Sequence, residues 1–156
     1  MPHPVAATMD ALAYWLRQHA DLTSFASNIW STPPDNLPRL PAIVILWDNE
    51  NASQFDGSGD VPMNRQYLDE TLEVRVLSDQ VDAQRSQTQL LTAVNAIRET
   101  VNSHQSLRTL ENVATCMQAR YEAAKYEPVE YGDQAEINGA TVTVRALIEQ
   151  VVQFAG

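Results

Sequence analysis

Four carboxylates near the middle of the chain are the residues whose types come nearest to a cation site. Asp48, Glu50, Asp56 and Asp60 lie on a polar stretch that also carries Gly57 and Gly59. Clustered carboxylate oxygens of this kind suit a hard cation such as Ca²⁺. The spacing does not match an EF-hand, because the required glycine and the terminal bidentate glutamate are out of register. We therefore favour a solvated loop, with a small metal-binding enzyme as a remote alternative.

The histidines and the single cysteine give no catalytic pattern. His3, His19 and His104 have no regular spacing, and His19 is expected to cap the end of a helix, where the dipole favours it. Cys116 is the only cysteine, which excludes an internal disulfide and a thiolate metal cluster, and its alternating segment predicts a buried thiol. The sequence contains no His-Glu-x-x-His motif, glycine-rich phosphate loop or nucleophile elbow. We expect a protein that is not an enzyme and needs no cofactor.

The charge balance limits the possible partners. Twenty acidic residues against ten basic ones give a formal net charge of −10, and Lys125 is the only lysine. This charge disfavours wrapping of nucleic acid, so no sequence-specific nucleic-acid binding is expected. Arginines suit fixed bidentate contacts between proteins, although simple solubility explains the acidic excess equally well. No apolar run is long enough to span a membrane, and the N-terminus lacks a basic segment of the secretory type, so a cytoplasmic site of synthesis is expected.

Hydrophobic periodicity predicts two main helices. The first is expected from Pro4 to His19, and the second follows an N-cap at Asp79 and ends at about Val101. Leu91 is expected beside the core stripe of the second helix. The residues at helical spacing are Val5, Met9, Leu12 and Leu16 in the first helix and Leu90, Val94, Ile97 and Val101 in the second.

Four strands are expected around these helices. Prolines at 33, 34, 38 and 41 hold the chain extended before the first strand. The expected strands are Pro41–Trp47, Thr71–Ser78, Val113–Tyr121 and Thr141–Val152. The polar excursion at 48–69 predicts a long β-hairpin with its tip at 56–60. The element order favours a single α+β domain over residues 1–156, with an antiparallel or mixed sheet and two main α-helices packed on one face.

The order of these elements resembles the tail-terminator, or tail-completion, proteins of long-tailed bacteriophages. The helix that ends in LRQHADLTSFASNIW leads into PPDNLPRLPAIVIL, and the strand ETLEVRVLSD is followed by the helix AQRSQTQLLTAVNAIRETV. The resemblance covers about Val5 to Val101. It implies a structural virion protein that forms a homohexameric ring on the tail tube, ends tube polymerisation and joins the tail to the head-completion or connector complex.

The resemblance also implies partners and a location. The partners would be other copies of the chain, the tail tube protein and a head-completion or connector protein, with no membrane. The protein would be found at the head-tail junction of the virion and, during assembly, in the host cytoplasm. The alternative within the same class of virion proteins is a head-tail connector of the neck or adaptor type.

Charge and placement suggest which residues would form the contacts. Tyrosines in the acidic 121–131 segment are favoured as interface residues over Trp30 and Trp47, which are expected in the core or at strand ends. The Thr141–Val152 strand is expected to expose an edge that pairs with a neighbouring copy, with the long hairpin as the other possibility. Asp56 and Asp60 are expected at the lumen or rim. The candidate subunit contacts are Arg65, Tyr67, Arg75 and Arg85 against Asp48, Glu50, Glu122 and Glu127.

Overall fold

The computed structural model describes residues 4–34, 39–51, 65–79, 82–107, 116–131 and 134–151. Its helices are α1 (Pro4–Gln18), the 3-10 helix η1 (Ala20–Asn28) and α2 (Ala83–Ser103). Its strands are β1 (Ile29–Trp30), β2 (Ala42–Asn51), β3 (Arg65–Leu77), β4 (Cys116–Tyr126), β5 (Val129–Tyr131), β6 (Gln134–Ile137) and β7 (Gly139–Val151). No helix in the described ranges is long and apolar enough to cross a membrane.

The main sheet has five strands in the order β1-β2-β3-β7-β4. Strand β1 runs parallel to β2, and the other neighbours are antiparallel. Strands β5 and β6 form a separate two-stranded sheet. The predicted α+β class with a mixed sheet is therefore confirmed, and β2 and β3 form the predicted antiparallel hairpin.

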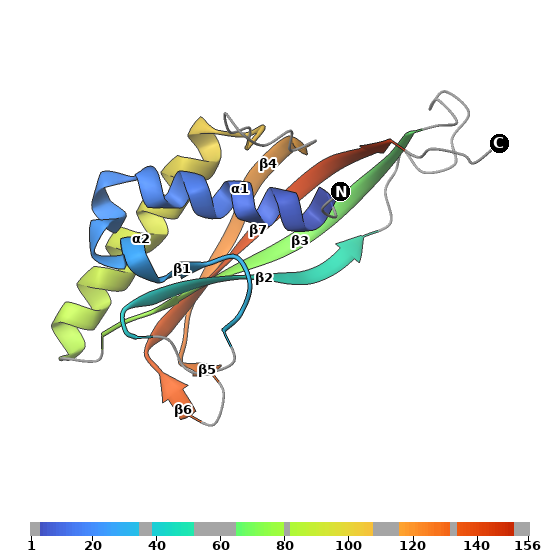
Figure 1. Ribbon diagram of the computed structural model, residues 1–156. Coiled ribbons are helices and arrows are strands. Elements are labelled where there is room, and N and C mark those ends of the chain that lie inside the picture. The colour runs from blue at the N-terminus through green and yellow to red at the C-terminus, as the bar shows by residue number, and fades with distance from the viewer. Residues whose placement is uncertain are drawn as a thin grey trace.

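Helices α1 and α2 cover one face of this sheet (Figure 1). Alternation along β3 and β7 sends apolar side chains to the helices and polar ones to the other face, because successive side chains of a strand point to opposite sides. Leu72, Val74 and Val76 of β3 and Val142, Val144 and Ile148 of β7 are all buried on this side, and the expected core residues of both helices are also buried. We call the opposite face, to which the polar side chains point, the open face.

The second helix begins later than predicted. Its N-cap is Asp82, whose Oδ1 accepts from the Arg85 amide at 2.7 Å. Asp79, the predicted cap, instead forms an ion pair with Arg85 at 3.0 Å. Leu91 is 49% exposed and does not lie beside the core stripe, so that prediction is also wrong.

The strands differ from prediction mainly in their ends. Strand β2 continues through the polar residues to Asn51, because Asn49–Asn51 pair with Asp69–Thr71 of β3. Strand β4 extends to Tyr126, while residues 113–115 of its predicted start lie outside the described residues. The predicted edge strand is wrong: β7 lies between β3 and β4 and has a hydrogen-bonded neighbour on each side.

The β5–β6 hairpin lies at one end of the sheet (Figure 1). Val129 and Ile137 from this hairpin form a second small apolar cluster with Ala42 of β2 and Leu77 of β3. This hairpin is not among the four strands that the sequence predicts. The cluster fixes the hairpin against the sheet by burying apolar surface.

Candidate interaction surface

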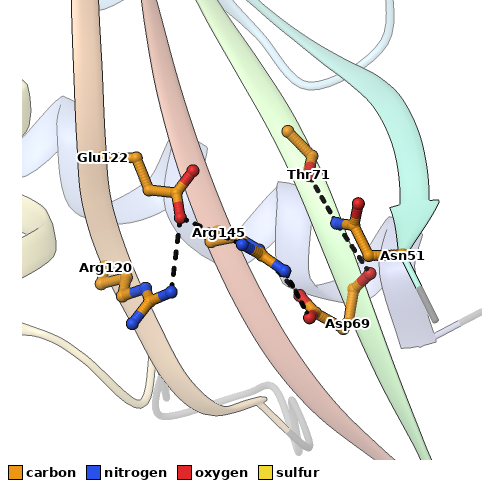
Figure 2. A network of polar contacts seen from close by, with 6 residues as sticks. All are labelled: Asn51, Asp69, Thr71, Arg120, Glu122 and Arg145. Atoms are coloured by element: carbon orange, nitrogen blue, oxygen red, sulfur yellow. Dashed lines mark hydrogen bonds and ion pairs between the residues drawn. The ribbon is translucent and has the colours of Figure 1, made fainter. Parts of the chain in front are cut away.

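The open face carries a continuous polar network across four strands, shown in Figure 2. Its centre is Arg145 of β7, which the register places between Thr71 of β3 and Arg120 of β4. Arg145 Nη2 lies 2.7 Å from Asp69 Oδ2, and Nε donates to Asp69 Oδ1 at 3.1 Å. These two contacts form the bidentate fork that arginine makes with carboxylates.

The network extends from Arg145 toward both sheet edges. Arg145 Nη1 contacts Glu122 Oε1 at 3.3 Å, and Arg120 Nη2 contacts the same oxygen at 3.4 Å. On the other side, Asn51 Nδ2 donates to Thr71 Oγ1 at 2.8 Å. The hydrogen bonds to Asp69 are the main reason that the pKa of Arg145 is raised above its ordinary value. The arrangement holds alternating charges in fixed positions on a partly exposed surface.

Four of the predicted subunit contacts lie in ion pairs within their own chain. Arg75 contacts Glu73 at 3.0 Å, and Arg85 pairs with Asp79 as described above. Glu122 belongs to the polar network, and Glu127 lies 4.0 Å from Lys125. Their role between subunits remains a prediction.

The other predicted site residues are less fully described. Asp48 and Glu50 are exposed on β2, at the end remote from β1. Arg65 and Tyr67 lie at the start of β3, but their side chains are outside the described part, as is the side chain of Cys116. Asp56 and Asp60 lie wholly outside the described residues. The cation-site hypothesis on these carboxylates therefore stays untested.

A buried carboxyl that sequence reasoning missed lies on the helix-covered face. Glu70 of β3 is only 1% exposed, and its Oε2 accepts from Trp47 Nε1 at 2.7 Å. Burial raises the pKa of Glu70 to about 7; the Trp47 hydrogen bond opposes this shift, and a hydrogen bond with Glu50 adds to it. The signal was present in the sequence, because Glu70 occupies an apolar position of the alternation that continues through Leu72.

Trp30 and Trp47 both lie on strands, and both are exposed. Trp30 ends β1 as expected and is 38% exposed. Trp47 lies within β2 and is 55% exposed, so its assignment to the core or a strand end is wrong. Among the tyrosines favoured as interface residues, Tyr126 is 50% exposed and Tyr121 is half-buried. The side chain of Tyr131 is not described.

His19, Asp21 and Glu99 bring three possible metal-ligand atoms within 4.8 Å of one another. Both nitrogens of His19 already have partners, since Nδ1 accepts from the Asp21 amide at 3.1 Å and Nε2 lies 2.9 Å from Glu99 Oε2. The pKa of Glu99 is lowered, chiefly by the His19 hydrogen bond. His19 thus caps the start of η1 rather than the end of the first helix, and the cluster is explained by capping.

A groove of about 720 Å³ lies on the open face beside the β5–β6 hairpin. Its charged and polar lining includes Glu73, Arg75, Lys125, Glu127, Thr141 and Thr143. Small-molecule sites are lined predominantly by apolar and aromatic side chains, so this mixed-charge groove fits a protein contact better.

Comparison with known proteins gives a match in fold. No protein-family model matches the sequence, and no curated protein does. Among solved structures, the chain is similar to one from a structure described as the virion of a native gene transfer agent (GTA) particle. The TM-score is 0.62 at 14% sequence identity, and the match covers 91% of this chain and 94% of the other. At this identity the similarity establishes a shared fold.

Proposed function

We propose that this chain is a structural protein of a virion, which forms a ring on the tail tube, ends tube polymerisation and joins the tail to the head-completion or connector complex. The observation that carries the proposal is the fold shared with a chain of a virion particle, over 91% of one chain and 94% of the other. The chain acts as a single domain, through protein surfaces and without catalysis or a cofactor.

The acidic charge supports this role. With a formal charge of −10 on each copy, a ring presents a wall that repels DNA. A genome that passes through such a ring is not held by it. Asp56 and Asp60, which lie in sequence between β2 and β3, are the proposed lumen or rim residues.

The open face supports a role in assembly. Its polar network and the adjoining groove hold charges of both signs in fixed positions, which suits specific recognition of another protein. Arg75, Glu122 and Glu127 belong to this face or its edge and remain our candidates for contacts with neighbouring copies, the tube protein or a connector.

Purified protein tests the proposal directly. Native mass spectrometry and electron microscopy should detect closed rings, and the protein should co-purify with tail tube protein and cap tubes assembled in vitro. A chain that stays monomeric and never associates with tubes would contradict the proposal. A head-tail connector of the neck or adaptor type is the alternative that the same fold supports, and co-purification with portal or adaptor protein in place of tube protein would favour it.

A further inference from the structure

The outer sides of β2 and β4 carry complementary side chains at the two ends of the same cross-strand rows. The register joins Trp47 of β2 to Leu72 of β3, Leu72 to Val144 of β7, and Val144 to Tyr121 of β4. Trp47 and Tyr121 therefore stand at opposite ends of one row across the sheet. The adjacent row begins at Asn49 and ends at Arg120.

The β2 edge presents a fixed aromatic ring next to acidic side chains. Strand β1 pairs only with Ile43 and Val44, so in the described part of the chain the rest of β2 has no strand on its outer side. Trp47 is the most exposed large apolar side chain among the described residues, yet its indole is fixed by the hydrogen bond to buried Glu70. Asp48 and Glu50 beside it are exposed.

The β4 edge presents arginines at the corresponding level. The guanidinium carbon of Arg98, from α2, lies 5.1 Å from the centroid of the Tyr121 ring. The Arg120 side chain is 60% exposed, and the nearby Glu122 is already held by Arg120 and Arg145. The Ala119 amide donates to the Gln105 carbonyl at 2.6 Å, so this amide is not available to pair with a strand of another copy.

We propose that the β2 edge of one copy docks through its side chains on the β4 edge of the next copy. Trp47 packs against the Arg98–Tyr121 pair, and Asp48 and Glu50 face Arg98 and Arg120. Copies that each carry −10 repel one another, so a stable contact requires opposite charges at the point of approach.

The contact joins two different surfaces and is therefore heterologous, which gives a ring when the rotation between copies closes. This inference rests on the proposed function, because it names the surfaces through which the proposed ring forms. It also replaces the edge that the sequence suggested, since the Thr141–Val152 strand is internal.

Charge reversal tests the contact in the full-length chain. Asp48→Lys and Arg120→Glu should each weaken self-association about tenfold or more, measured by sedimentation velocity and native mass spectrometry at low salt. The double variant should return to within about threefold of wild type, because every interface regains a complementary pair. Arg39→Glu is the matched charge control, since Arg39 is exposed, precedes β2 at the end remote from Trp47, and belongs neither to the polar network nor to the groove.

A second pair of variants tests the aromatic contact. Trp47→Ala should disrupt the oligomer, whereas Leu91→Ala, which removes an exposed apolar side chain of α2, should not. Circular dichroism melting identifies any variant that fails to fold. If Trp47→Ala does not fold, Asp48→Lys tests the contact, because the Asp48 side chain is exposed and its replacement should leave the fold intact. Rings that persist unchanged in Asp48→Lys and Arg120→Glu would overturn this contact but leave the proposed ring intact. A wild-type chain that stays monomeric and does not bind tubes would overturn both.

Discussion

Arg145 forms a bidentate contact with Asp69 on the open face, with Nη2–Oδ2 at 2.7 Å and Nε–Oδ1 at 3.1 Å. The two residues are 76 positions apart in sequence, on neighbouring strands β7 and β3. The third guanidinium nitrogen, Nη1, is directed to Glu122 of β4. One side chain therefore ties three strands together on the face that we assign to protein contacts.

Replacing Arg145 with lysine should destabilise the fold by about 1 kcal/mol, because an ammonium cannot reproduce the fork or reach both carboxylates. The side chains of Arg145 and Asp69 are 31% and 23% exposed, so solvent screening keeps the effect small. Urea unfolding measures the change. Arg75→Lys is the control, since Arg75 contacts a carboxylate of its own strand. A double-mutant cycle with Asp69→Asn that gives no coupling would contradict this account.

The stability of the fold should decrease as the pH rises from about 4.5 to about 7, because of Glu70. The pKa of this carboxyl is raised from 4.5 to about 7, so in this range the folded chain keeps a proton that the unfolded chain has released. In this range the unfolded state binds fewer protons than the folded state. The free energy of unfolding therefore falls by ~2 kcal/mol between pH 4.5 and pH 7.

Glu70→Gln isolates this effect. Glutamine keeps an acceptor for Trp47 Nε1 but has no charge to desolvate. The variant should exceed wild type in stability by ~2 kcal/mol at pH 8 and match it closely at pH 5, in urea unfolding at both values. Glu73→Gln, on the open face of the same strand, should not change the pH dependence in this way. Identical pH profiles for wild type and Glu70→Gln would show that the carboxyl is not coupled to folding.

The regular parts of the fold could be predicted because they follow local periodicity. Leu72, Val74 and Val76 alternate as a half-buried strand must, and Leu90, Val94 and Ile97 repeat at helical spacing. The polar ends of β2 and β3 could not be predicted in this way. Their strand conformation results from pairing with each other and with β7, which composition does not reveal.

The candidate surface depends on contacts between segments that are distant in sequence. Whether Glu70 is buried depends on Trp47, which is 23 residues away on another strand. The position of β7 within the sheet depends on β4 joining outside it, and this order made the predicted edge wrong. The charges at the edges of the sheet can be read from the sequence, but their alignment in rows requires the register.

The start of α2 provides a local test of stability. Asp79 and Asp82 are both suitable caps by type, and the structure selects Asp82, which accepts from the Arg85 amide at 2.7 Å. Asp82→Ala should cost about 1 kcal/mol in urea unfolding, because a helix N–H loses its acceptor. Asp82→Asn, which can cap equally well, should retain most of the stability. Equal losses for alanine and asparagine would show that the charge, and not the cap, stabilises this helix end.

Gly139 at the start of β7 is a position where a single added methyl group should disrupt the packing. A Cβ there would lie 2.7 Å from Val129 Cγ2 and 2.8 Å from the Val76 carbonyl oxygen, both too close for a real contact. Gly139→Ala should therefore destabilise the fold by about 1–3 kcal/mol, as overpacking does. Adding Val129→Ala removes the first clash but not the second, because the carbonyl belongs to the backbone of β3. The double-mutant cycle should show partial compensation, measured by urea unfolding. A neutral Gly139→Ala would contradict the close approach of Val129 and the Val76 carbonyl to this position.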